Sequence, residues 1–147
     1  MQMDAYKTID TIVHLQKRFP SLILCGSVSL ILLDILPNRS VGDIDFATTD
    51  VNVIGKLNLR QDSYDDEETN GGYTSFSGYY RANKINVLFF TLGTEIKTET
   101  ITTPTDTIRS QLVSDILYWK EKYNRTKDLS DLDSISLNML EKAVFDK

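Results

Sequence analysis

The opening of the chain alternates apolar and polar positions with the period of a helix. Residues 4–19 carry apolar side chains at three- and four-residue intervals, which predicts an amphipathic helix that ends before Pro20. Residues 21–25 form a short apolar run typical of a buried strand, and Gly26-Ser27 after it predicts a tight turn. Residues 28–36 are apolar over the length of a helix. We therefore expect helix, strand, turn and helix in this order.

Residues 43–47 repeat acidic and apolar side chains with a two-residue period. Asp43-Ile44-Asp45-Phe46-Ala47 alternates acidic and apolar residues, as a half-buried strand does, after a loop at 37–42. Residues two apart in a strand project from the same face, so Asp43 and Asp45 are expected to lie on one side. This arrangement brings two carboxylates within reach of one hard cation. The alternative is an exposed strand face that holds no ion.

The rest of the chain predicts a sheet with helices packed against it. We expect a short helix at 50–57, a weak strand at 59–64, hairpin strands at 73–81 and 85–92 joined by Ala82-Asn83-Lys84, an edge strand at 97–101, a helix from Thr103-Pro104 to Tyr123, and a last helix at 128–143. This order predicts an α+β fold with a mixed or antiparallel sheet. The 147 residues contain no repeat or linker, so we expect one domain, with a core at about 21–102 and C-terminal helices at about 104–143.

Composition narrows the class of function. The formal charge of −5 argues against a broad basic surface, so extensive non-specific DNA binding is not expected. A single cysteine and a single histidine cannot form an internal disulfide or a Cys/His zinc cluster, so any metal would take oxygen ligands. The chain has no apolar run of membrane-spanning length and no signal pattern, which predicts a cytoplasmic protein without a membrane partner.

A second acidic pair occurs at Asp131-Leu132-Asp133, inside the last predicted helix. Residues two apart on a helix point to different sides and cannot share an ion, so we expect a solvated face here. Asp128 and Asp131 would then cap the helix or pair with Lys127. Strand geometry thus favours the first acidic pair, Asp43 and Asp45, as the metal site.

The stretch from Leu24 to Phe46 resembles the DNA polymerase β-like nucleotidyltransferase superfamily. Its signature is an apolar strand, Gly-Gly or Gly-Ser, a helix, and then Asp-apolar-Asp-apolar. This chain has Leu24-Cys25-Gly26-Ser27 and Asp43-Ile44-Asp45-Phe46, with a slightly longer gap between them. Arg39-Ser40 before the acids and residues 127–132 look like the AbiEii group of bacterial abortive-infection toxins. The resemblance implies the minimal nucleotidyltransferase fold.

The resemblance also implies an enzyme that uses Mg²⁺ or Mn²⁺ and a nucleoside triphosphate. Asp43 and Asp45 would hold the metal, and the Gly26-Ser27 turn would bind the triphosphate through backbone N–H groups and the serine hydroxyl. Further nucleotide-binding residues would be Arg39, Ser40 and Lys84. The implied reaction moves a nucleoside monophosphate to a hydroxyl of an RNA, a protein or a small molecule.

The chain departs from the family at the third carboxylate. The AbiEii group places it in a Lys-x-Asp pattern on a later strand, and the matching segment here is Lys84-Ile85-Asn86. Asn86 remains a candidate catalytic-site residue because an amide oxygen can ligate an ion, but it cannot take a proton from an attacking hydroxyl. Asp62, Asp65 and Glu95 are the candidates to replace the missing acid. The alternative function is a catalytically impaired nucleotide-binding protein or a toxin–antitoxin-type interaction protein.

Overall fold

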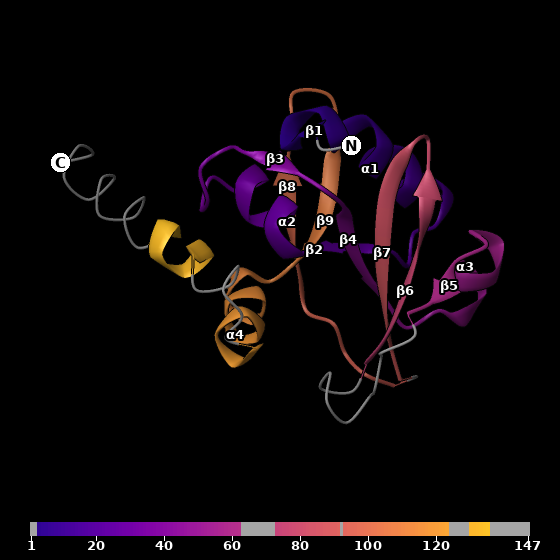
Figure 1. Ribbon diagram of the computed structural model, residues 1–147. Helices are drawn as coiled ribbons and strands as arrows, with labels where there is room; N and C mark the ends of the chain where they lie inside the picture. The colour runs from indigo at the N-terminus through magenta and orange to yellow at the C-terminus, as the bar shows by residue number, and fades with distance from the viewer. Residues whose placement is uncertain (1–2, 63–72, 92, 124–129, 136–147) are drawn as a thin grey trace, which may run out of the picture.

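A computed structural model describes residues 3–62, 73–91, 93–123 and 130–135 of the chain (Figure 1). Within these residues a seven-stranded sheet has the order β5-β6-β7-β4-β2-β9-β8. β4 runs antiparallel to β2 and parallel to β7, and β2 runs parallel to β9, so the sheet is mixed. Helices and a mixed sheet give the α+β class that the sequence predicts.

The large sheet contains short and long strands, and the described helices are short. Its strands are β2 (Ile23–Cys25), β4 (Ile44–Thr48), β5 (Arg60–Gln61), β6 (Tyr73–Tyr80), β7 (Asn83–Phe90), β8 (Thr98–Thr102) and β9 (Thr107–Gln111). A two-stranded sheet pairs β1 (Met3–Asp4) with β3 (Ser40–Val41). The helical elements are the 3-10 turn η1 (Ala5–Thr8) and the helices α1 (Ile9–Arg18), α2 (Gly26–Leu32), α3 (Val51–Lys56) and α4 (Val113–Tyr123).

The main core lies between α1, α2 and one face of the sheet. The central strands contribute buried side chains that alternate along each strand, and these join buried residues of both helices: Leu24, Phe46, Val87 and Ile108 with Ile12, Leu15, Val28 and Ile31. Cys25 and Ala47 alternate to the opposite face and form a separate small cluster with Phe90. Since Asp45 lies between two residues of the main core, Ile44 and Phe46, its side chain emerges on that opposite face.

Most predicted elements are confirmed with shifted ends. The first helix begins as η1 and continues as α1, and the predicted loop at 37–42 contains the short strand β3. The hairpin of β6 and β7 turns on two residues, Arg81 and Ala82, instead of the expected three-residue link. Lys84 therefore belongs to β7 and not to the turn.

The predicted helix from Thr103 to Tyr123 is wrong over its first half. Thr103 begins a turn instead: its Oγ1 accepts a hydrogen bond of 2.9 Å from the N–H of Asp106. This is the bond a helix N-cap would make, but β8 and β9 then pair as a hairpin. β9 also pairs with β2, so a contact distant in sequence overrides the local helical signal. The helix α4 follows only from Val113.

The C-terminal part of the described chain lies beyond one side of the sheet. α4 and residues 130–135 are found there, whereas α3 and β5 lie at the other side (Figure 1). Residues 130–135 are helical, as predicted, and the remainder of the predicted helix at 128–143 lies outside the described residues. No helix in the described part of the chain is long and apolar enough to cross a membrane.

Candidate functional site

The turn between β2 and α2 requires glycine for two reasons. Gly26 has a φ of +70°, in the left-handed region that glycine adopts without steric cost. A Cβ atom at this position would lie 2.4 Å from Oδ2 of Asp45, closer than real Cβ contacts permit. Cys25 and Asp45 are register partners on β2 and β4. The Gly26-Ser27 turn therefore packs the beginning of α2 directly against the Asp45 carboxylate.

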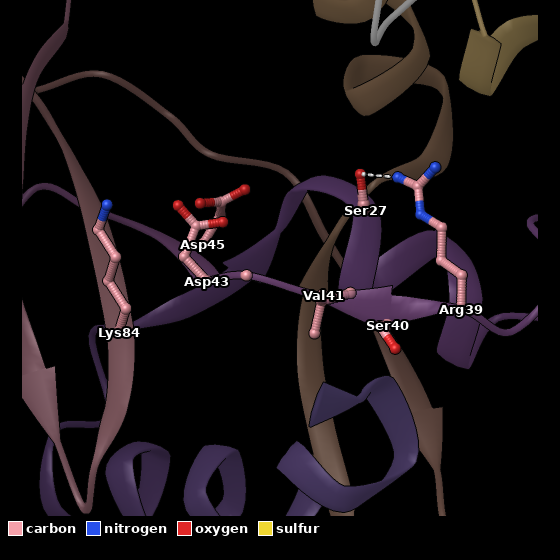
Figure 2. Close-up of a pocket in the computed structure, with 8 residues that line it drawn as sticks. Ser27, Arg39, Ser40, Val41, Asp43, Asp45 and Lys84 are labelled. Carbon is pink, nitrogen blue, oxygen red and sulfur yellow. Dashed lines mark hydrogen bonds between the residues drawn. The ribbon is translucent and has the colours of Figure 1, made fainter. Parts of the chain in front are cut away.

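Asp43 and Asp45 present their carboxylates on the same side of the chain (Figure 2). Asp45 lies in β4, and Asp43 immediately precedes this strand. Both residues are half-buried. They open into a pocket of 430 Å³, called the carboxylate pocket below. Its lining residues are Ser27, Arg39, Ser40, Val41, Gly42, Asp43, Asp45 and Lys84. Two predicted site residues do not line it: Gly26, which packs against Asp45, and Asn86, the register partner of Asp45 on β7.

Two cations flank the acids. Lys84 on β7 is exposed and lies on one side of Asp43 and Asp45, and Arg39 lies on the other side (Figure 2). The pocket thus combines two negative and two positive side chains. Ser40 also lines the pocket, but its hydroxyl points away from the two carboxylates (Figure 2).

Arg39 is held by an acid distant in sequence. Its Nη1 donates to Oδ1 of Asp131 at 2.5 Å, and its Nη2 donates to Oγ of Ser27 at 3.1 Å. Asp131 is fully buried, whereas the Arg39 side chain is 37% exposed. The expectation of a solvated face is therefore wrong for Asp131, whereas Asp133 is exposed as expected. Lys127 and Asp128, which the sequence placed with Asp131 in a helix cap or an ion pair, lie outside the described residues.

Ser27 completes this arrangement. Its hydroxyl accepts from Arg39 and donates to Oδ2 of Asp131 at 3.3 Å. The hydroxyl has a single hydrogen, and Asp131 receives it. The three side chains link the beginning of α2, the loop before β4 and the helical segment 130–135. Sequence spacing gave no signal for this link, because Arg39 and Asp131 are 92 residues apart.

The loop that carries Arg39 and Asp43 is also tied to the beginning of the chain. β1 pairs with β3, and Nδ2 of Asn38 donates to Oδ2 of Asp4 at 2.8 Å. This hydrogen bond, followed by one from the N–H of Tyr6, lowers the pKa of Asp4 below its ordinary value. The loop is therefore fixed on both sides, by Asp4 and by Asp131.

Asn86 lies beside Asp45, and its oxygen faces β6. Oδ1 of Asn86 lies 2.7 Å from Oγ of Ser75 and 3.2 Å from Oγ of Ser77. The same hydroxyls contact Asp62, at 2.6 Å from Ser75 and 3.0 Å from Ser77. Asp62 is thus separated from Asn86 by one layer of hydroxyl groups.

Among the described residues, a third acidic ligand is not found beside Asp43 and Asp45. In the described part of the chain, no group of three or more His, Cys, Asp or Glu side chains is placed to hold a metal ion. Asp62 is engaged by Ser75 and Ser77, Glu95 is exposed in the segment after β7, and Asp65 lies outside the described residues. The available donors are two carboxylates and neutral oxygens, which is a set that fits a hard cation keeping part of its water shell.

No family model matches the chain, and searches of curated proteins and of solved structures found no match. The likeness of Leu24 to Phe46 to nucleotidyltransferases thus remains a resemblance of motifs. Two features of the chain bear on its function: the geometry of the carboxylate pocket and that resemblance.

Proposed function

We propose that the chain binds a nucleoside triphosphate and a divalent cation in the carboxylate pocket and transfers the nucleoside monophosphate to a hydroxyl. The observation that carries the proposal is the meeting of Asp43, Asp45, Arg39 and Lys84 in one pocket of 430 Å³. Paired carboxylates are ligands for Mg²⁺, and the two cationic side chains suit phosphate oxygens. The volume is within the range of small-molecule sites.

Asp43 and Asp45 would hold Mg²⁺ or Mn²⁺, which supplies charge neutralisation at the phosphates when bound. The carboxylate donors fit these ions. Gly26 lets Asp45 keep its place beside the beginning of α2, because a side chain at position 26 would collide with Oδ2 of Asp45. The resemblance of the Gly26-Ser27 turn to the superfamily signature is the second support.

The roles of the flanking residues follow from their contacts. Asp131 and Ser27 orient the Arg39 guanidinium, whose remaining N–H groups would meet a phosphate. Lys84 would approach the phosphates from the other side as a mobile point charge. Asp131 takes the Ser27 hydroxyl hydrogen, so we expect Ser27 to act mainly by holding Arg39 at the edge of the carboxylate pocket.

A second candidate function is nucleotide binding without turnover. It is favoured by Asn86, which stands in register with Asp45 where the resemblance places a proton acceptor. An amide cannot accept the proton of an attacking hydroxyl. The chain would then act as a nucleotide-dependent interaction protein, for example in a toxin–antitoxin type of system. Transfer to an RNA, a protein or a small molecule would be absent.

Thermal unfolding with nucleoside triphosphates and MgCl₂ or MnCl₂ tests the binding that both candidates share. A ligand at a hundred times its dissociation constant stabilises the folded state by about 2.7 kcal/mol. Asp45→Asn should lose this stabilisation, because it removes a charged ligand. Asp106→Asn is the matched control, since Asp106 pairs with Lys17 outside the carboxylate pocket. Equal responses of wild type and Asp45→Asn would show that the site is misplaced.

Label transfer separates the two candidates. The protein would be incubated with triphosphates labelled at the α-phosphate, Mg²⁺ or Mn²⁺, and a cell extract that supplies acceptors. Covalent label on any acceptor, lost in Asp45→Asn, is the expected result for a transferase. Binding without transfer from any of the four common triphosphates would leave the second candidate.

A further inference from the structure

Ser75 and Ser77 on β6 stand between Asn86 and Asp62, and each hydroxyl lies within hydrogen-bond distance of both residues. Oγ of Ser75 is 2.7 Å from Oδ1 of Asn86 and 2.6 Å from Oδ2 of Asp62. Oγ of Ser77 is 3.2 Å from Oδ1 of Asn86 and 3.0 Å from Oδ1 of Asp62. All four side chains belong to half-buried residues. The hydrogens can therefore be counted against the acceptors for the contacts among these four side chains.

When the amide oxygen of Asn86 faces the serines, there are fewer hydrogens than contacts that need one. Each hydroxyl has one hydrogen, whereas an amide oxygen and an ionised carboxylate can only accept. Ser75 can then donate to Asn86 or to Asp62, but not to both. One of its two short contacts would bring oxygen against oxygen with no hydrogen between them. Such a contact is unfavourable in a half-buried position.

When the amide of Asn86 is turned by 180° about its last side-chain bond, every contacting pair among the four side chains has one hydrogen. This rotation about the last side-chain bond exchanges oxygen and nitrogen with little change in shape. The amide nitrogen then donates its two hydrogens to Ser75 and Ser77, and the two hydroxyls donate theirs to Asp62. Each of the four residue pairs is then joined by a hydrogen. We propose that Asp62, through Ser75 and Ser77, turns Asn86 so that its nitrogen faces β6 and its oxygen faces Asp45.

The register gives this orientation a consequence. Asn86 pairs with Ser77 on β6 and with Asp45 on β4, so the three residues stand in a row on one face of the sheet. Neighbouring strands are about 4.8 Å apart. When the nitrogen faces β6, the oxygen is left on the side of β4. Asn86 then adds a neutral oxygen ligand beside Asp45, and Asp62 is a positioning residue that does not itself touch the cation.

Asp62 decides the orientation because it is the acceptor of both hydroxyl hydrogens. In an Asp62→Ala variant the serines would donate to the amide oxygen of Asn86 and draw it away from Asp45. The metal-binding part of this inference rests on the proposed function. The orientation of the amide does not, and it can be measured without metal or nucleotide.

The orientation is tested by NMR of the side-chain amides in ¹⁵N-labelled protein. Asn86→Ala identifies the Asn86 signals by their loss. If both N–H groups of Asn86 donate, their hydrogens should exchange with water about tenfold more slowly than those of the exposed Asn52 side chain. The reason is that a hydrogen bond must break before each hydrogen can exchange. Asp62→Ala should change this exchange rate, because the N–H groups then leave the serines and face Asp45, and the control Asp106→Ala should leave it unchanged. An Asn86 amide that exchanges like Asn52 in the wild type would overturn the proposal.

The ligand role is tested by Mn²⁺ titration followed by electron paramagnetic resonance, with and without ATP. Removal of a residue that orients a ligand weakens metal affinity by about ten- to a hundredfold, and we expect this for Asp62→Ala and for the double variant Ser75→Ala/Ser77→Ala. Asp106→Ala should bind Mn²⁺ as the wild type does. Unchanged affinity in the Asp62 and serine variants would overturn the ligand role. A wild type that binds no Mn²⁺ would refute the proposed function, and amide exchange would still decide the orientation.

Discussion

Gly26 constrains the position of Asp45. Its backbone is left-handed, and the space beside it belongs to the Asp45 carboxylate. Gly26→Ala should cost about 1–2 kcal/mol for the left-handed conformation alone, and it should displace Asp45 as well. We expect a lower denaturation midpoint in urea and no stabilisation by nucleotide with Mg²⁺.

Gly55 provides the matched control for this substitution. It lies inside α3, and a Cβ at its position would meet nothing within 4 Å. Gly55→Ala should stabilise the protein by about 0.5–1 kcal/mol, because alanine loses less backbone freedom in a helix. A Gly26→Ala protein as stable as wild type, with an intact nucleotide response, would contradict the packing of the turn against Asp45.

The Arg39–Asp131 pair should respond unequally to the loss of either partner. Arg39→Ala leaves a fully buried carboxylate without its guanidinium and should cost about 3 kcal/mol or more. Asp131→Ala leaves a side chain that is already 37% exposed and can be hydrated, so it should cost less. Urea unfolding of both variants measures the difference. The double variant should be more stable than Arg39→Ala, and an additive loss would contradict a direct pair.

At the scale of residues, sequence reasoning succeeded where chemistry was local. The spacing of Asp43 and Asp45 and the Gly26-Ser27 turn follow from patterns within a few residues. The partner of Arg39 could not be predicted in this way, because Asp131 comes from a segment whose acidic pattern is equally compatible with a solvated helix face. The link from Asp62 to Asn86 through Ser75 and Ser77 likewise depends on the register of β6 and β7, which alternation alone does not specify.

The β6–β7 hairpin turns on residues that are poorly suited to its geometry. Arg81 and Ala82 have φ angles of 51° and 65°, which favour glycine, asparagine or aspartate. Ala82→Gly should therefore stabilise the protein by about 1 kcal/mol, because it relieves a left-handed alanine. Calorimetric melting measures this gain. Thr105→Gly, in the β8–β9 turn, lacks a positive φ and should instead destabilise.

At the scale of elements, the strands with strict alternation or strong β-branched content were the most predictable. β4, β6 and β7 were predicted close to their observed bounds. β9 was predicted as a helix, because Ile108, Leu112 and Ile116 are spaced as on a helix. What makes this segment a strand is pairing with β2 on one side and β8 on the other. Such long-range pairing has no signature within the segment itself.

At the scale of the molecule, segments far apart in the chain converge on the loop before β4. Asp4 holds it through Asn38, and Asp131 holds it through Arg39.

The contact between Asp4 and Asn38 predicts that stability depends on pH. The folded pKa of Asp4 is lowered from 3.8, so its stabilisation is present above that value and is lost as the pH falls below it. The difference in melting temperature between wild type and Asp4→Asn should therefore be constant from pH 7 to 5 and shrink near pH 3. A difference that grows on acidification would contradict this contact.

The link between Arg39 and Asp131 also bears on the order in which the protein assembles. Its partners are separated by 92 residues, and contacts of such long range raise the contact order and slow folding. During synthesis Asp43 and Asp45 emerge long before residues 130–135, so the nascent chain carries both carboxylates while Arg39 still lacks Asp131. The arginine side of the carboxylate pocket can therefore be completed only after residue 131 has been made, and a ribosome-bound chain short of Asp131 would carry both acids of the pocket without an anchored Arg39.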